Sequence, residues 1–241
     1  MIEIEKRGVI GLENKTIEKW NRAAKAYAVS QEESEFAIVN KEVVSNRFQD
    51  LSGKKVLDLG CGYGWYTDYF ASIGADVTGC DGSEKMIELS KNKYPNCNFE
   101  CVDIEQKLPY KSDCFDLVFC NQVLMDIEKL EELFEEIYRV TQNGGIFYFS
   151  IVHPAFYDCD WKKDIKGFRN AKIMTRYLSE YSFDNDFWGK TTHYHRTISK
   201  YINTAIEKGF CLTHLGEPVS YDGVKKSKEF PLFLFAEFKK C

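Results

Sequence analysis

The sequence predicts an α/β fold: a doubly wound, mostly parallel sheet of seven strands, with a helical cover before it and an aromatic-rich cap inserted into it. Three observations lead to this prediction. Short apolar runs alternate with amphipathic runs over residues 55–152, which is typical of right-handed βαβ units with helices on both faces of a sheet. Two further apolar runs return near the end of the chain. A chain of 241 residues can bury one sizeable core, so residues 1–241 are expected to form a single domain.

The first 50 residues predict a cover of two amphipathic helices. Apolar residues recur at helical spacing in 16–27 and again in 33–48. Gly53 interrupts the second pattern, and the core, 51–152, follows. The expected buried stripes are Ile17, Trp20, Ala24 and Tyr27 in the first helix and Phe36, Val39, Val43 and Phe48 in the second.

The core alternates between strand and helix signals. Ser83 stands directly before one amphipathic run, where serine is a preferred N-cap. Gly144 and Gly145 are expected to end the last helix of the core, as glycine commonly does. The predicted strands are 55–59, 76–80, 98–102, 115–120 and 146–152, and the predicted helices are 65–73, 84–93 and 127–140.

Residues 153–196 lose this periodicity and are rich in aromatic and charged side chains. A long aperiodic stretch inside a compact domain is often a functional insertion, so we expect a cap over a site. Regularity returns in 197–241, the C-terminal part of the sheet. There the pattern predicts a helix at 198–208 that ends at Gly209, followed by strands at 210–218 and 232–238.

Composition limits the partners and the location of the protein. The 37 acidic and 32 basic residues give a net charge of −5, and no basic aromatic groove is visible, so no nucleic-acid partner is expected. No apolar run approaches the roughly 18 residues of a membrane span, and the N-terminus has no apolar signal core. The nine cysteines include no C-x-x-C pair, so we expect neither a disulfide framework nor a zinc site, and a reducing, cytoplasmic location.

The segment VLDLGCGYG, residues 56–64, ends the first predicted strand and opens a helix. Glycines at such a turn let backbone N–H groups approach a ligand closely. The spacing is G-x-G-x-G, and Trp65 occupies the position where a dinucleotide-binding loop has its third glycine. Asp58 would repel a pyrophosphate but suits an ammonium group. The loop therefore favours a zwitterionic nucleoside over a dinucleotide.

Polar residues also end the neighbouring strands of the predicted sheet. Asp81 ends the second strand, Asp103 the third, and Asn121 and Gln122 the fourth. In open α/β sheets, ligands bind outside the carboxyl ends of the strands, beside the point where the strand order reverses. We expect these side chains and Asp58 to meet around one ligand.

Four segments in this order, VLDLGCGYG, VTGCDGS, CVDIEQKLPY and FDLVFCNQVLMDI, resemble class I S-adenosylmethionine-dependent methyltransferases, in particular the type 11 and type 25 small-molecule branch. The resemblance implies a Rossmann-like methyltransferase fold with S-adenosyl-L-methionine as cofactor and S-adenosyl-L-homocysteine as product. It implies a transferase that methylates a small-molecule acceptor. Residues 51–152 would then bind the cofactor, and 153–196 would cap the substrate.

The resemblance also assigns the residues of the glycine turn. Gly60 and Gly62 would lie along the methionine part and the ribose, with Cys61 between them. Asp58 would lie near the ammonium group of the cofactor, directly or through water. Asp81 would accept hydrogen bonds from both ribose hydroxyls.

The adenine end is assigned in the same way. Gly82 and Met86 would pack beside the ribose and adenine. Asp103 would accept from the adenine amino group, and Ile104 would offer its backbone N–H and apolar cover. Asn121 would lie near the methionine part and the transfer site. Met86 and Ile104 are also explained as ordinary core residues.

The candidate residues for chemistry are less specific. Tyr27 either closes over the cofactor or is a core aromatic, and His214, inside a late strand, suits a structural role. A base is needed only if the acceptor loses a proton. No third ligand accompanies the two histidines of THYHRT, so no metal is expected. The catalytic candidates are His153, His193 and His195, each of which a structural hydrogen bond would also explain, and the substrate candidates are Trp161, Trp188, Tyr194 and Arg196.

Two other functions remain open at this stage. One is a non-catalytic S-adenosylmethionine-binding protein, and the other is a related transfer such as aminopropyl transfer. The latter would need acids for a polyamine, for which Glu180, Asp184 and Asp186 are the candidates. The sequence identifies neither the acceptor atom nor the oligomeric state.

Overall fold

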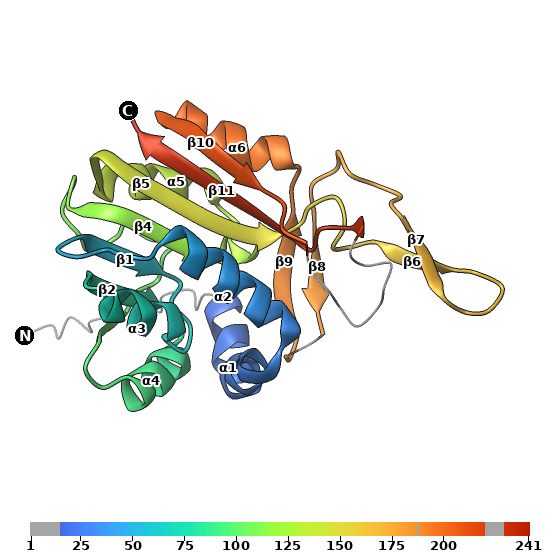
Figure 1. Ribbon diagram of the computed structural model, residues 1–241, viewed down its shortest axis with the longest axis horizontal. Coiled ribbons are helices and arrows are strands. Elements are labelled where there is room, and N and C mark those ends of the chain that lie inside the picture. The colour runs from blue at the N-terminus through green and yellow to red at the C-terminus, as the bar shows by residue number, and fades with distance from the viewer. Residues whose placement is uncertain (1–14, 187, 220–228) are drawn as a thin grey trace, which may run out of the picture.

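The computed structural model describes residues 15–186, 188–219 and 229–241, with a seven-stranded sheet at its centre. The strand order is β10-β11-β5-β4-β1-β2-β3, and β11 alone runs antiparallel to both of its neighbours within this described sheet. The predicted doubly wound, mostly parallel sheet is therefore confirmed (Figure 1). The strands are β1 (Lys55–Leu59), β2 (Asp76–Asp81), β3 (Asn98–Cys101), β4 (Phe115–Asn121), β5 (Thr141–Val152), β10 (Phe210–Gly216) and β11 (Phe233–Lys240).

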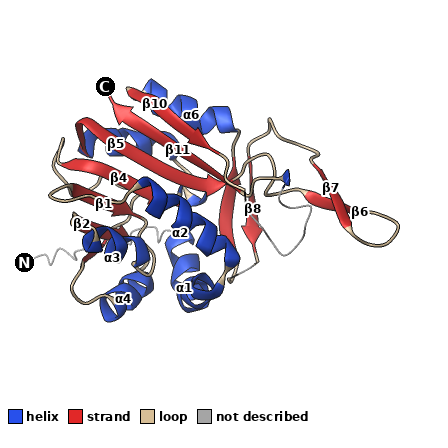
Figure 2. Cartoon of the chain, viewed as in Figure 1, coloured by secondary structure: helices blue, strands red, loops and turns tan. Residues whose placement is uncertain are grey.

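Helices cover both faces of the sheet. On one face α2 (Glu35–Arg47) and α3 (Trp65–Ser72) pack Val44 and Phe70 against Phe119 and Tyr148 of the central strands. On the other face α5 (Leu130–Val140) and α6 (Ile198–Glu207) pack against the opposite side of β4 and β5. Burial of these apolar faces is the main stabilising contribution to the layered fold. α4 (Glu84–Lys93) follows β2, and α1 (Lys15–Glu33) lies beside α4 and α2 (Figure 2).

Two details of the helix prediction are wrong. The predicted stripe of α2 is correct for Phe48, which is buried, and in part for Val39 and Val43, which are partly buried, but Phe36 is 40% exposed. The buried residues within the helix are Ala37, Asn40 and Val44, because apolar residues occur on adjacent positions and the pattern fits two faces. α5 ends at Val140, and β5 begins immediately at Thr141, so Gly144 and Gly145 do not end the helix. Both glycines lie in an irregular stretch of β5, where the pairing with β4 shifts register.

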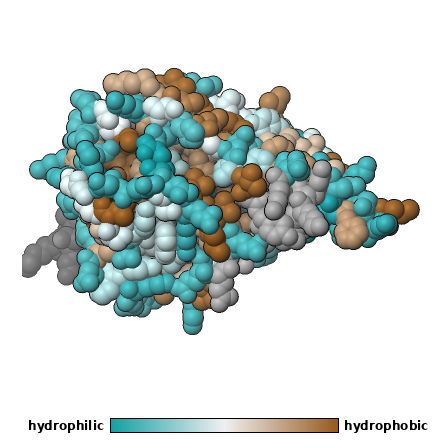
Figure 3. Space-filling view, viewed as in Figure 1, coloured by the Kyte–Doolittle hydropathy of each residue, from teal (hydrophilic) through white to brown (hydrophobic). Residues whose placement is uncertain are grey.

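The predicted cap contains two β-hairpins. β6 (Asp160–Lys163) pairs with β7 (Arg169–Ile173), and β8 (Tyr181–Asn185) pairs with β9 (Thr191–His195). The first hairpin projects away from the sheet, and apolar side chains lie on its exposed end (Figures 1 and 3). The second hairpin packs against α1 and against the short helix η1 (Leu124–Asp126) that follows β4. It therefore brings cap residues to the carboxyl end of the sheet.

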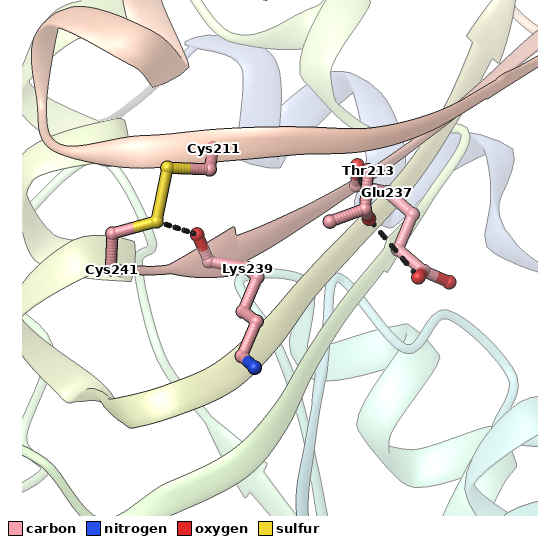
Figure 4. The surroundings of a disulfide bond; sticks show 5 residues. All are labelled: Cys211, Thr213, Glu237, Lys239 and Cys241. Atoms are coloured by element: carbon pink, nitrogen blue, oxygen red, sulfur yellow. Dashed lines mark hydrogen bonds between the residues drawn. A yellow bond between two sulfur atoms is a disulfide. The ribbon is translucent and has the colours of Figure 1, made fainter.

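One disulfide departs from the sequence expectation. Cys211 of β10 is bonded to Cys241, next to the end of β11 (Figure 4). The antiparallel register places Cys211 opposite Lys239, a proximity that the sequence alone does not reveal. The bond lies at the end of the sheet where β5 begins, opposite the carboxyl ends of the parallel strands. The other seven cysteines are free.

Within the part of the chain that the structure describes, no helix is both long and apolar enough to span a membrane.

Candidate active site

The turn after β1 contains three glycines with left-handed backbone angles, Gly60, Gly62 and Gly64, and at two of them a side chain would also collide with its neighbours. Gly60 has φ +76°, and its N–H donates to the carbonyl of Cys80 over 2.8 Å. A Cβ on Gly60 would lie 2.4 Å from a methyl carbon of Val123, so glycine is what lets the segment after β4 approach this turn. Gly64, with φ +90°, begins α3, and a Cβ there would meet the ring of Phe99 at 2.7 Å.

Asp81 connects the turn after β1 to the turn after β2. One carboxylate oxygen accepts from the Gly62 N–H at 3.0 Å, and the other accepts from the Ser83 N–H at 2.8 Å. Ser83 in turn caps α4 by accepting from the Met86 N–H, as predicted. Burial raises the pKa of Asp81, while the two backbone donors oppose that rise. The carboxylate is thus fixed in place, and its remaining lone pairs face the cleft that it lines.

Asp58 lies deeper, with only 2% of its surface exposed. Its carboxylate accepts a hydrogen bond from the Thr67 hydroxyl at 2.6 Å. Burial raises the pKa of Asp58 to about 7, an effect that the Thr67 bond opposes. A cation bound nearby would compensate for the burial of this carboxylate.

Two adjoining clefts open at the carboxyl ends of β1, β2 and β4. Including their open mouths, the larger spans about 640 Å³ and the smaller about 500 Å³. They share the lining residues Tyr27, Gly60, Gly62, Asn121 and Gln122. They lie where the strand order reverses between β1 and β4, the position expected for a ligand. Every residue predicted to bind the cofactor lines one of them: Tyr27, Asp58, Gly60, Cys61, Gly62, Asp81, Gly82, Met86, Asp103, Ile104 and Asn121.

The far end of the larger cleft is lined by the turn after β3 and by α1. Asp103 accepts from the Glu105 N–H at 3.0 Å, and the buried Ile104 and Met86 supply apolar walls. Ile17 of α1 closes the cleft from the other side. The sequence analysis proposed that Tyr27 of this helix closes over the cofactor, but it did not identify Ile17 as part of the cleft wall.

A third cavity under the cap, called the acceptor pocket after the role proposed for it below, spans about 1040 Å³ including its open mouth. It shares Trp20, Tyr27 and Gln122 with the larger cleft, so the two cavities adjoin. Gln122 has φ +57°, which is uncommon for a residue with a side chain and is often found at functional sites. The pocket is mostly apolar and includes Phe36, Met125, Tyr157, Trp161, Lys172, Trp188, His193 and Phe233.

Comparison with known proteins agrees with this geometry. A family model described as a methyltransferase domain matches residues 57–149. A crystal structure of an S-adenosylmethionine-dependent methyltransferase from Listeria monocytogenes is 31% identical, with a TM-score of 0.71, and the alignment covers 80% of this chain and 93% of that one. The chain belongs to the S-adenosylmethionine-dependent methyltransferases.

Two further proteins are similar to the methyltransferase over different lengths of the chain. A methyltransferase structure from Mesorhizobium loti is 27% identical with a TM-score of 0.75, and the alignment covers 87% of this chain and 99% of that one. The ubiquinone biosynthesis O-methyltransferase of Coxiella burnetii is 34% identical over 110 residues. That match spans 44% of this chain and about half, 47%, of the Coxiella enzyme. The methyltransferase is thus an enzyme that uses S-adenosyl-L-methionine.

Of the three catalytic candidates, the structure places only His193 on the acceptor pocket. The Nδ1 atom of His153 accepts from the Ala155 N–H at 3.1 Å, and its Nε2 lies 2.8 Å from Glu217, so both ring nitrogens hold the turn after β5. The Nε2 atom of His195 bonds the Tyr177 carbonyl at 2.9 Å. Neither His153 nor His195 lines the clefts or the acceptor pocket of the methyltransferase, and the structure gives both a structural explanation.

The four substrate candidates divide in the same way. Trp161 and Trp188 line the acceptor pocket, and the Trp188 ring lies 5.0 Å from that of Tyr27. Arg196 donates to the carbonyls of Ile127 and Glu128, which fixes the segment before α5. Arg196 and Tyr194, whose ring lies 5.3 Å from the Arg196 guanidinium, line a smaller cavity, as do His153 and His195. This smaller cavity adjoins the acceptor pocket, with which it shares Tyr157 and His193.

The sequence analysis missed Asp126, which lies in η1 and is only 3% exposed. One of its carboxylate oxygens accepts from the indole N–H of Trp20 at 3.1 Å, and the other lies 3.2 Å from Nε2 of His193. Burial raises the pKa of Asp126, and burial lowers the pKa of His193 to about 4. The sequence signal that could have identified Asp126 is its position inside the apolar run VLMDI, because a carboxylate is rarely buried without a function or a partner.

Proposed function

We propose that the methyltransferase holds its methyl donor in the two clefts at the carboxyl ends of β1, β2 and β4, and an apolar acceptor in the acceptor pocket. The observation that carries this proposal is that all the predicted cofactor residues line two clefts, the larger of which adjoins a mostly apolar cavity. In this arrangement Asp81 accepts from the ribose hydroxyls, and Asp103 and Ile104 bind the adenine. Asp58 attracts the ammonium group, whose charge offsets the burial of that carboxylate.

The chemistry that this site supports is an in-line displacement at the methyl carbon. The main contribution of the enzyme is orientation, for which effective molarities of about 10⁵ M or more are known in well-aligned systems. Tyr27, Trp20 and Gln122 lie between the larger cleft and the acceptor pocket, so they would align the two substrates. The cap hairpins would exclude water, which strengthens electrostatic interactions in the site.

The acceptor is proposed to be a small molecule with an aromatic or apolar body. Trp161, Trp188 and Tyr157 supply the flat walls, and Lys172 is the one lysine, arginine, aspartate or glutamate on the pocket wall among the described residues. A relative that is named a ubiquinone biosynthesis O-methyltransferase is consistent with such an acceptor. Aminopropyl transfer is not favoured, because Glu180, Asp184 and Asp186 are exposed on the surface and do not line the pocket.

A cytoplasmic location is proposed on the basis of the seven free cysteines, which suit a reducing compartment, and the Cys211–Cys241 disulfide would be an exception there. The domain boundaries given above also remain a proposal. They are a helical cover at 1–50, a cofactor-binding core at 51–152, a substrate cap at 153–196 and the C-terminal part of the sheet at 197–241, of which 1–14, 187 and 220–228 lie outside the described residues.

The proposal is tested by calorimetric binding of S-adenosyl-L-homocysteine, followed by incubation with methyl-labelled S-adenosyl-L-methionine and a small-molecule extract. We expect saturable binding and a labelled product in the low-molecular-weight fraction. Label that appears only in protein or nucleic acid would contradict the proposed acceptor class. Absence of binding would contradict the proposed cofactor site.

A further inference from the structure

We propose that Asp126 and His193 together form the general base of the methyltransferase, and that its acceptor is methylated on a hydroxyl oxygen. This inference rests on the cofactor and acceptor sites proposed above. Asp126 lines the larger cofactor cleft, and His193 lines the acceptor pocket, so the pair spans the boundary between the two cavities. A group that removes a proton from the acceptor during methyl transfer has to be at this boundary.

The pair is a carboxylate and an imidazole at ion-pair distance, and within the described residues the buried Oδ1 atom of Asp126 has no hydrogen-bond partner. Oδ1 of Asp126 lies 3.2 Å from Nε2 of His193, and both side chains are at most 5% exposed. The other oxygen of Asp126 is fixed by the Trp20 indole N–H at 3.1 Å. The amide of Asn185 lies 3.4 Å from the same Nε2 atom and donates to the Tyr157 hydroxyl. In the tautomer whose hydrogen is on Nε2 and faces Asp126, Nδ1 is the nitrogen that accepts a proton.

Nδ1 of His193 is buried and has no hydrogen-bond partner within residues 15–186, 188–219 and 229–241. Buried polar atoms are nearly always paired in native proteins, so an unpaired one calls for a specific explanation. A hydroxyl group of an acceptor in the adjoining pocket would supply the missing donor. A carboxylate beside the imidazole would then stabilise the imidazolium that forms, as in other carboxylate–histidine pairs that act as bases.

A neutral amine does not need such a base, because it can attack before it loses a proton. A hydroxyl is a poor nucleophile until its proton is removed, and it is uncharged when it enters an apolar pocket. Two mutually oriented buried groups at the boundary therefore favour an O–H acceptor. The aromatic walls of the acceptor pocket suit a phenol or a similar flat hydroxyl compound.

Protons and charges balance within the site. The methyl donor brings one positive charge on sulfur, and the ionised Asp126 brings one negative charge. In the step, the acceptor O–H bond breaks and its proton moves to Nδ1 of His193, while the oxygen forms its bond to the methyl carbon. The methyl–sulfur bond breaks, and its electron pair stays on sulfur. Sulfur is then neutral, and the protonated His193 beside Asp126 is neutral as a pair.

The state of the pair should depend on the charge in the cleft. Burial raises the pKa of Asp126 and lowers that of His193 to about 4, so without a bound cation a proton on the pair is favoured on Asp126 over His193. A cation in the adjoining cleft favours the ionised carboxylate. S-adenosyl-L-methionine should therefore release a proton on binding, and S-adenosyl-L-homocysteine should not. The titratable and charged groups around the pair are Tyr27, Asp81, Tyr157, Asp158, Tyr194, Arg196 and Tyr201.

The test is calorimetric binding of both ligands at about pH 7.5 in two buffers that differ in ionisation enthalpy, which reports the protons released. We expect S-adenosyl-L-methionine to release roughly one more proton than S-adenosyl-L-homocysteine does. Both ligands carry the same ammonium group, so any proton that Asp58 releases on binding contributes equally to both measurements and cancels in their difference. Asp126→Asn should abolish the difference. Asp184→Asn, an exposed control on the hairpin that carries His193, should preserve it.

A second measurement identifies the acceptor atom. The wild-type protein, incubated with carbon-13-labelled methyl donor and extract, should yield a product whose methyl resonance is that of an O-methyl group. The His193→Gln variant should form none of this product but should still bind S-adenosyl-L-homocysteine. Equal proton release by both ligands in the wild-type protein, or an N-methyl product, would overturn the inference. If neither ligand binds, the proposed cofactor site fails instead, and the two failures are thereby distinguished.

Discussion

Asp81→Ala removes the carboxylate that is expected to hold both ribose hydroxyls. In the structure the carboxylate accepts from two backbone N–H groups, at 2.8 and 3.0 Å, so it is already fixed before a ligand binds. Each hydrogen bond to a charged group contributes about 1.5–3 kcal/mol. Two lost bonds to the ribose therefore amount to about 3–6 kcal/mol, or roughly a 10²- to 10⁴-fold weaker Kd. Because Asp81 is only partly buried, we expect the lower end of this range.

The assay is isothermal titration of S-adenosyl-L-homocysteine, with urea unfolding measured on the same samples. The unfolding control is necessary because Asp81→Ala also leaves the N–H groups of Gly62 and Ser83 without their acceptor. Asp81→Asn retains an acceptor oxygen and separates loss of charge from loss of the turn. Asp76→Ala, at the exposed other end of β2, is the matched control and should bind like the wild type. A folded Asp81→Ala protein with a Kd within about threefold of the wild type would refute the role assigned to this carboxylate.

The remaining predictions concern the glycine turn, the pocket and the pH dependence. Gly60→Ala should lower the free energy of unfolding by at least about 1 kcal/mol and weaken S-adenosyl-L-homocysteine binding, because φ is +76° and the new Cβ would lie 2.4 Å from Val123. Urea titration measures the first effect and calorimetry the second. Trp188→Ala should raise the KM for the acceptor about tenfold and leave the Kd of S-adenosyl-L-homocysteine unchanged, since Trp188 lines only the acceptor pocket. The carboxyl of Asp58, with its pKa raised to about 7, is ionised above that pH and protonated below it. The affinity for S-adenosyl-L-homocysteine should therefore fall by up to about tenfold per pH unit below pH 7. Asp58→Asn should remove this dependence, and a flat calorimetric pH profile in the wild type would contradict it.

Much of the fold was predictable because local signals agree with the global arrangement. The strand β1, the helix α4 and the Ser83 cap match the prediction residue by residue, since apolar periodicity, capping chemistry and turn residues all indicate the same boundaries. The convergence of Asp58, Asp81 and Asp103 follows from parallel strands, whose carboxyl ends share one edge of the sheet.

What the sequence could not predict depends on contacts between distant segments. Trp20, Asp126 and His193 come from α1, η1 and β9, and only the packing of the second hairpin against the other two elements brings them together. The disulfide depends on the register of β10 against β11 in the same way. The phase of α2 was misread because adjacent apolar residues such as Ala37, Ile38 and Val39 fit more than one helical face.

The most direct measurement of the central claim is a crystal structure of the protein with S-adenosyl-L-homocysteine. The account predicts that the nucleoside occupies the clefts between β1 and β4, with its ribose hydroxyls on Asp81, its adenine beside Asp103 and Ile104, and its sulfur facing the acceptor pocket. Density for the ligand at any other surface, with these clefts closed by protein side chains, would contradict the account.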